Sequence, residues 1–471
     1  MKGAWIAFVG LLLALAPSPA EALPMYALGS GRTCGNCHIS PTYQDRDGWN
    51  NPELPERKCN LSCISCHVSP GGGGLRNTSG RYYGQSSVSM LALQERSYSD
   101  YGRDVAPAGM LAYYRENFGT ASPDARGHDI PSNFEAVSED RRGGALNFGK
   151  PLLGPSEYAL WDGRYGDLNA DPLLALGLDL RGAYWTGSGS IFPMQVDLHA
   201  QLHPIEHLSL VGTLAARGRV AGPIAVVEQA SPVYPRNAYV MIHELPYAAA
   251  LRAGIFVPTF GTYLDDHTSY IRRWFDLDLA KSESSVLGVE ASIAPNYPYA
   301  SISAFRNLTP VGAEASTDGY GAAVALGWRD LSFSAGAHAM LKRGDVTADL
   351  DAIGLSWGLS PFALWESVPL VTMGELSFGR RADPIVGGDR TFFALYQEVW
   401  WLIGNGLDLR FKYDLGSQDL DAADALEQRL SLGLGVSPVP GLSLLIQGRT
   451  LVPAAGVEGG SDLFTTLHLW L

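Results

Sequence analysis

The sequence predicts a mainly β fold, namely a transmembrane antiparallel β-barrel of about 16 strands with a small N-terminal dihaem cytochrome c domain. First, apolar and polar residues alternate with period two from residue 172 onward, as they do in strands with one apolar and one polar face. Second, there are 54 glycines, 10% aromatic residues and only 17% charged residues, which suits a barrel facing lipid. Third, two Cys-x-x-Cys-His motifs lie near the N-terminus.

Residues 1–22 have the features of a secretory signal peptide. Lys2 supplies the positive charge, residues 4–16 form an uncharged apolar run, and Ala20-Glu21-Ala22 forms a cleavage site. The run is shorter than the ~20 residues of a spanning helix, so we expect it to be removed during export. The net charge of -14 argues against nucleic acid as a partner and against a polybasic lipid-binding patch.

Each motif has the spacing required for covalent attachment of haem c. The first comprises Cys34, Cys37 and His38, and the second comprises Cys63, Cys66 and His67. The two thiols of a motif form thioethers to the two vinyl groups of one porphyrin, and the histidine reaches the iron as its proximal ligand. We therefore expect two covalently bound haem c groups, with His38 and His67 as the proximal iron ligands.

Other chemistries use cysteine pairs with this spacing. A zinc ribbon, a thioredoxin-like redox pair and two structural disulfides are the alternatives. They leave the histidine after both pairs unexplained, and export delivers the chain to the compartment where haem is attached. Cys59 is left over. A spare thiol, an intermolecular disulfide and a role in haem attachment are all open for it.

The distal haem ligands have no motif of their own. His128, in the run Arg-Gly-His-Asp, is the first candidate for one haem, against the alternative of a solvated loop histidine. His267 is the second candidate and lies among ionisable residues at 258–273. That segment either binds iron or haem, seats the N-terminal domain, or forms a hydrated loop that narrows the pore. His199 and His203 fall on the polar face of one expected strand, where most histidines are merely solvated and a haem-ligand role is the alternative.

The N-terminal part of the chain is expected to form a dihaem cytochrome c domain at 23–100 and a linker or barrel plug at 101–171. Glycines 71–74 directly follow the second motif and its Ser-Pro pair, and a glycine run lets backbone approach a porphyrin closely. Arg76 and Arg81 could pair with haem propionates, because a guanidinium fork suits carboxylates. A flexible linker is the alternative for this stretch.

The barrel is expected at 172–471. The expected strands are roughly 9–13 residues long, which suits a tilted strand that crosses a bilayer. They lie near residues 172–186, 191–203, 207–219, 235–245, 247–257, 283–293, 297–307, 318–328, 331–343, 346–358, 360–380 (a segment that could be broken differently), 391–402, 406–415, 428–436, 441–451 and 462–471.

The alternation is clearest at 407–415, where the odd positions are apolar and the even positions carry Asp408, Arg410, Lys412 and Asp414. The same pattern at 194–203 places Met194 on an apolar face, opposite Gln195. A soluble β-sandwich or propeller is the alternative. Such folds rarely put acidic and basic residues on one face of so many long strands while the other face stays apolar.

An exported haem c segment followed by a porin-like barrel resembles the fused cytochrome–porin family, the outer-membrane iron-oxidising cytochrome type. The resemblance covers essentially the whole mature chain. The two motifs and the alternating strands from residue 172 onward carry it. It implies a place in the bacterial outer membrane, with the haem domain on the periplasmic side or within the barrel. The better-known members carry one motif, and the second haem of this chain would lengthen the conducting path.

The resemblance implies an electron-transfer protein rather than an enzyme. Its expected partners are the lipid bilayer, an extracellular electron donor or acceptor such as Fe(II), and a periplasmic electron carrier. The alternative is an outer-membrane channel or transport protein whose haem domain is a redox sensor or plug. A soluble dihaem peroxidase is a third hypothesis, but it needs catalytic acid–base groups at an open distal site, and the sequence offers no convincing set.

Overall fold

The computed structural model describes two parts of the chain. The N-terminal part consists of Cys63 and residues 67–76. The second part runs from 173 to 470, with gaps at 188, 206, 222–225, 263–265, 267, 278–283, 296, 309–318, 330–332, 345–348, 360–369, 383–387, 405–406, 423–424, 440 and 453–458. Among these residues, no helix combines the length and the apolar character needed to cross a bilayer.

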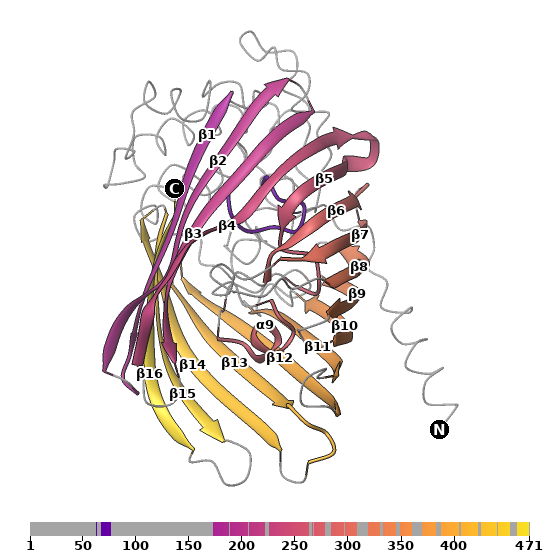
Figure 1. The fold of residues 1–471 in the computed structure, drawn as a ribbon. Helices are drawn as coiled ribbons and strands as arrows, with labels where there is room; N and C mark the ends of the chain where they lie inside the picture. Colours follow the sequence, from indigo (N-terminus) through magenta and orange to yellow (C-terminus); the bar gives the residue numbers. More distant parts are fainter. Residues whose placement is uncertain are drawn as a thin grey trace, which may run out of the picture.

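Sixteen strands of the described chain form one closed barrel (Figure 1). Each strand pairs antiparallel with the strands before and after it, and β1 pairs with β16, for example through Asp179 opposite Trp470. Closure gives every strand two hydrogen-bonded neighbours, so no sheet edge is left exposed. The expected antiparallel barrel of about 16 strands is confirmed.

The strand bounds follow the period-two pattern closely. They are β1 (Leu174–Trp185), β2 (Ser190–Ile205), β3 (Leu208–Ala221), β4 (Val226–Leu245), β5 (Ala249–Phe256), β6 (Val286–Ile293), β7 (Pro298–Asn307), β8 (Gly319–Arg329), β9 (Phe333–Gly344), β10 (Asp349–Leu359), β11 (Leu370–Ala382), β12 (Asp389–Gly404), β13 (Leu407–Ser417), β14 (Leu426–Val439), β15 (Leu442–Val452) and β16 (Gly460–Trp470). A 3-10 turn, η8 (Pro246–Ala248), links β4 to β5. The largest differences are at β4, which begins nine residues before the expected 235, and at β11, which begins ten residues after the expected 360.

The alternation separates a charged interior from an apolar exterior. On β13 the side chains of Lys412 and Asp414 are buried, whereas Phe411 between them is 43% exposed. On β14 Leu432 is 62% exposed on the outer face, next to the buried Ser431. The predicted sidedness of segment 407–415 is therefore confirmed, with its charged side chains turned toward the lumen.

Met194 was expected on the apolar outer face, and that expectation is wrong. Its side chain is buried in a small cluster with Ala183, Phe192 and Phe464. The register between β1 and β2 shifts at this point, so that Gly182 pairs with Pro193 while Arg181 pairs with Gln195. Such a bulge inserts one residue and exchanges the two faces of the strand, which period-two counting cannot detect.

The connection from β5 to β6 folds into the barrel instead of extending away from it (Figure 1). It contains the short helix α9 (Tyr270–Trp274), which is capped by Ser269 and packs against β12 and β13. Phe260 and Phe275 of this connection stack with ring centroids 5.9 Å apart and are buried in the lumenal core. The described part of segment 258–273 therefore lies in the barrel interior and packs in one core cluster with Val68 of the N-terminal part, while a role in binding iron or haem stays a prediction.

Candidate functional site inside the barrel

Residues 67–76, which begin with the last residue of the second motif, lie inside the barrel (Figure 1, indigo). They form a small hairpin in which His67 pairs with Arg76 and the Val68 amide donates to the Leu75 carbonyl at 3.0 Å. Val68 and Leu75 are 4% and 5% exposed and belong to the same core cluster as Val211 of the barrel wall. Fully burying an aliphatic side chain stabilises by about 1.5–3 kcal/mol.

The structure describes two residues of the second motif, Cys63 and His67. The His67 amide donates to the Cys63 carbonyl at 2.8 Å, which closes one helical turn between the two residues. The backbone at Gly72 lies close to the motif, since a Cβ added there would lie 3.3 Å from Cys63 Sγ. Gly72 also has φ of 85°, which favours glycine. Thus the backbone at Gly72 approaches the Cys63 thiol closely.

Side chains of the barrel wall hold the hairpin in place. Arg252 of β5 donates to Ser69 Oγ at 3.3 Å and forms a salt bridge with Glu290 of β6 at 2.6 Å. At the other end, the Arg76 guanidinium lies over the Trp470 ring, 5.3 Å from its centroid. This contact joins Arg76 to the last strand, and a pairing of Arg76 with a haem propionate stays a prediction.

The wall facing this hairpin is apolar on its lumenal side, which the sequence analysis missed. The inward positions of β3, β4 and β5 carry Val211, Tyr239, Met241 and Phe256, all buried in one cluster with Val68. A polar face was expected on the lumenal side of these strands, because the alternation elsewhere places charged residues on one face. The signal was present in the sequence, since apolar residues occupy both faces of these strands over several positions.

His199 of β2 faces the lumen beside the hairpin and is 4% exposed. Its Nδ1 lies 2.9 Å from Thr213 Oγ1. Across all residues that the structure describes, its Nε2 finds no hydrogen-bond partner. A Cβ added at Gly74, where φ is 64°, would lie 3.5 Å from the His199 ring atom Cε1. The imidazole therefore lies directly against the hairpin.

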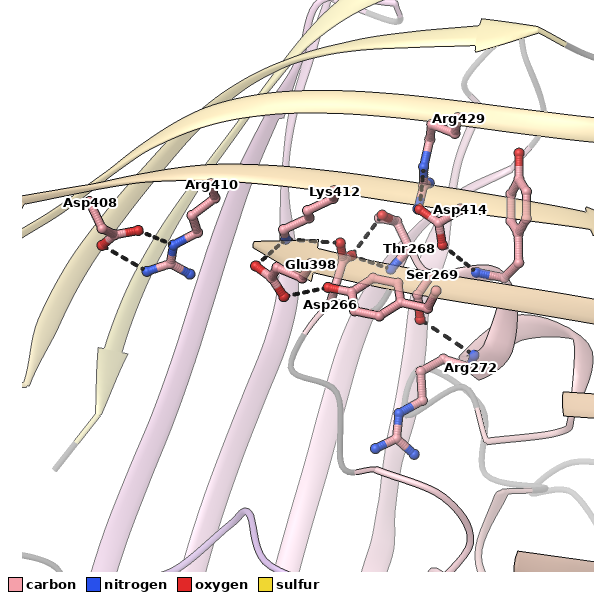
Figure 2. A network of polar contacts seen from close by, with 12 residues as sticks. Asp266, Thr268, Ser269, Arg272, Glu398, Asp408, Arg410, Lys412, Asp414 and Arg429 are labelled. Carbon is pink, nitrogen blue, oxygen red and sulfur yellow. Dashed lines mark hydrogen bonds and ion pairs between the residues drawn. The ribbon is translucent and has the colours of Figure 1, made fainter. Parts of the chain in front are cut away.

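A second lumenal site is a network of charged side chains where the β5–β6 connection meets β12 and β13 (Figure 2). Lys412 Nζ lies 3.1 Å from Asp266 and 3.8 Å from Glu398, and the Tyr396 hydroxyl donates to Glu398 at 2.5 Å. Burial opposes ionisation of Asp266, but Lys412, Arg429 and two hydrogen bonds from Thr268 outweigh it and hold its pKa well below the usual range.

The β5–β6 connection makes a second set of contacts with the barrel wall beside this network (Figure 2). Asp414 of β13 accepts hydrogen bonds from the Tyr270 amide at 3.1 Å and from Arg429 at 2.7 Å. Burial raises the pKa of the Tyr270 phenol to about 12. The ion pairs attach the connection rigidly to the wall, so the barrel interior at this level is narrowed by an ordered segment.

Only part of the expected haem site can be located. Cys63 and His67 lie in the lumenal hairpin and its preceding turn. His203 hydrogen-bonds with Ser209 at 3.1 Å, as does His243 at 2.8 Å. The other expected positions lie outside the described residues, namely Cys34, Cys37, His38, Cys59, Cys66, Arg81, His128 and His267. Within the described ranges, no three His, Cys, Asp or Glu side chains come together in a way that could hold a metal ion.

No protein-family model and no curated protein matches the sequence. Several solved structures resemble the barrel. An anion-selective porin from Comamonas acidovorans is 14% identical with a TM-score of 0.42, and the match covers 63% of this chain and 98% of that chain. The outer-membrane protein OmpT of Vibrio cholerae is 11% identical with a TM-score of 0.45, covering 63% and 97%. The outer membrane channel DcaP of Acinetobacter baumannii is 11% identical with a TM-score of 0.43, again covering 63% and 97%.

Proposed function

We propose that this protein is an outer-membrane c-type cytochrome that carries electrons through the bilayer by way of haems held in the barrel. The observation that supports this most is the position of the second motif. A segment that begins with its histidine, 67–76, is packed inside a closed barrel rather than outside it. A redox group attached to Cys63 and Cys66 would then lie within the lumen.

The outer surface supports a place in a membrane. Large apolar side chains on many strands are exposed on the outer face, including Leu198, Ile302, Ile353 and Leu432, each between 55% and 63% exposed. Their lumenal neighbours carry the charges described above. In water such an apolar surface would promote aggregation, whereas in a bilayer it is the expected exterior of a barrel.

Haem supplies the electron-accepting centre that the polypeptide itself lacks. The residues of this chain supply attachment and environment. Cys63 and Cys66 would hold the porphyrin, and His67 would hold its iron from one side. The apolar wall formed by Val211, Tyr239 and Phe256 would exclude water from one side of the site. A dry, rigid surrounding lowers the reorganisation that accompanies a change of charge.

The partners follow from the position of such a conduit. We propose an extracellular electron donor or acceptor, with ferrous iron as the first donor to test, and an electron carrier in the periplasm. Export by the signal peptide at 1–22 and haem attachment at Cys34, Cys37 and His38 belong to the same proposal.

The test is a covalent haem count per chain on protein purified from outer membranes. We expect two haems in the wild-type chain and one in a chain with Cys63→Ala and Cys66→Ala. A chain with Cys59→Ala is the matched control and should keep two, since Cys59 belongs to neither motif. A wild-type chain without covalent haem contradicts the proposal.

A second candidate function is a channel that the haem segment plugs. It is favoured by the lumenal position of both the hairpin and the β5–β6 connection, which together fill part of the pore. A chain that lacks residues 23–100 should conduct ions in planar bilayers far better than the full chain if this is the function. A haem-gated channel should also change its ion current when the haems are oxidised or reduced. An electron conduit does not require any such change in ion current.

A further inference from the structure

We propose that the outer face of β2, β3 and β4 binds the acyl chain of a membrane lipid in an apolar groove whose floor contains Gly212. The inference rests on the membrane position within the proposed function and not on its haems, so it holds equally for a chain without haem. The ligand class is a hydrocarbon chain, which the groove recognises by shape rather than by charge.

The groove is a hollow of about 420 Å³ in the wall formed by β1 to β5. Its floor consists of small residues on three neighbouring strands, because Ala200 pairs with Gly212 and Gly212 pairs with Ala238. Larger side chains such as Leu202 and Val240 form its edges. The volume lies within the roughly 300–1,000 Å³ of sites that bind small molecules.

The groove opens on the outer face of the barrel. The side chains of Val211 and Thr213 are buried on the lumenal side, so Gly212 between them faces outward. Leu210 and Leu214 have the same orientation as Gly212 and are 41% and 52% exposed. The hollow is therefore continuous with the apolar outer surface that is expected to contact the bilayer.

Described side chains leave the space over Gly212 unfilled. A Cβ added there would have no heavy atom of a described residue within 4 Å, apart from Gly212 itself and its chain neighbours. Gly374, an outward glycine of β11, differs, because a Cβ added there would lie 2.5 Å from the Trp357 ring. That indole is held over Gly374 by a hydrogen bond from its Nε1 to Gln397 at 3.0 Å. The chain thus covers Gly374 itself, whereas Gly212 is open within the part that the structure describes.

An acyl chain fits this groove because the lining is apolar. Of the described residues that line it, only Tyr239 has a polar side-chain group, and that side chain is buried on the lumenal side. The groove therefore selects a hydrocarbon rather than an ion or a sugar. Because an empty hollow would forfeit dispersion contacts, a flexible methylene chain gains attraction from the floor and both edges at once. The bilayer supplies such chains at high local concentration.

The alternative occupant is a second copy of the chain. A stable interface between proteins buries about 1,200–2,000 Å² and carries about one hydrogen bond per 100–200 Å². The described residues that line the groove on the outer face are alanines, leucines, a glycine and a valine, and they offer no side chain for such bonds. The lining therefore favours the acyl chain, and a dimer is an outcome of the test.

The experiment is native mass spectrometry of the full chain after reconstitution into vesicles of dioleoyl phosphatidylcholine or dioleoyl phosphatidylglycerol and extraction with detergent. We expect a monomer that retains one lipid, with equal retention of the two lipids because their acyl chains are identical. Gly212→Leu places a hydrocarbon side chain in the groove. It should lower the retained fraction about tenfold, which corresponds to about two buried methylene groups.

Gly448→Leu is the matched control. Gly448 of β15 also faces outward, between the buried Gln447 and Arg449, and a Cβ added there also meets open space among the described residues. It lies outside the groove, so this variant should retain the lipid as the wild-type chain does.

A second measurement on the wild-type chain guards against misfolding of the variants. A dioleoyl-like phosphatidylcholine with a photoactivatable diazirine in its acyl chain should label peptides of β2, β3 and β4 more than a peptide of β15. Unchanged retention in Gly212→Leu, retention that depends on the headgroup, equal labelling of β3 and β15, or a dimer that Gly212→Leu dissociates would each overturn the inference. A wild-type chain that enters vesicles but keeps no lipid would also overturn it and leave the proposed function intact. A wild-type chain that does not enter vesicles would overturn both.

Discussion

The Arg76 guanidinium lies over the indole ring of Trp470, 5.3 Å from its centroid. Trp470 is also the residue that pairs with Asp179 where β16 closes the barrel onto β1. Trp470 therefore takes part in barrel closure through its backbone and in seating the segment that follows the second motif through its indole ring. The hairpin at 67–76 is therefore packed against the barrel wall as part of the barrel interior.

The contact between Arg76 and Trp470 should stabilise the seated hairpin. A cation over an indole contributes about 0.5–2 kcal/mol, depending on its desolvation. We expect Arg76→Gln to accelerate hydrogen exchange of the Val68 amide, which bonds to Leu75 in the hairpin. Arg410→Gln is the control, because it removes a comparable contact between two barrel strands, where Arg410 of β13 lies over the Trp400 ring of β12, 4.4 Å from its centroid. Equal exchange in wild type and Arg76→Gln would contradict this role.

Arg252 should be among the most sensitive positions of the lumen. It and Glu290 are each 2% exposed and lie 2.6 Å apart. Arg252→Met leaves the Glu290 carboxylate buried without its cation, which costs about 3–5 kcal/mol. Denaturant unfolding in detergent should show the loss. Arg380→Met removes the exposed pair with Asp389 instead and should leave the midpoint nearly unchanged. Similar midpoints for the two variants would argue against a buried ion pair at Arg252.

Acid should release the β5–β6 connection. The pKa of Asp266 is held below its usual value in the folded chain, so its contribution to stability is complete above about pH 4 and declines as the pH falls further. We therefore expect Asp266→Asn to destabilise the protein at pH 7, and the difference from wild type to be smaller at pH 3. Unfolding midpoints at the two pH values measure this, with Asp389→Asn as an exposed control. A difference independent of pH would refute the ionised state of Asp266.

The outer face of β14 tests the membrane orientation. Leu432 is 62% exposed near the middle of that strand. An arginine at the bilayer midplane costs about 2–4 kcal/mol in a barrel, so Leu432→Arg should lose that much stability in lipid vesicles. Leu420→Arg, in the connection from β13 to β14, should be tolerated. A well-tolerated arginine at 432 would mean that this surface faces water.

The barrel was predictable because its determinants are local in sequence. Period-two alternation at 407–415 predicts β13 and the burial of Lys412 and Asp414, and the structure confirms both. Met194 was placed on the wrong face, since a bulge moves the strand by one residue and depends on how β1 pairs with β2. Nothing in the alternation of one strand reports the register of its neighbour.

Of the candidate site inside the barrel, only the Cys-x-x-Cys-His motif could be recognised from the sequence. Cysteine and histidine spacing predicts haem attachment at Cys63 and His67, and that stays a prediction. The contacts of the hairpin with Arg252, His199 and Trp470 join positions far apart in the sequence, and no local pattern encodes them. His199 looked like one of several solvated histidines on a polar face. Only burial and the lack of a hydrogen-bond partner for Nε2 among the described residues distinguish it.

The most direct test of the account is electron transfer across a bilayer. The full chain would be placed in vesicles that enclose a redox dye, and an impermeant ferrous donor would be added outside. We predict reduction of the enclosed dye through wild-type protein, and its loss in the chain with Cys63→Ala and Cys66→Ala. Reduction of both haems without reduction of the enclosed dye would contradict a conduit through the barrel.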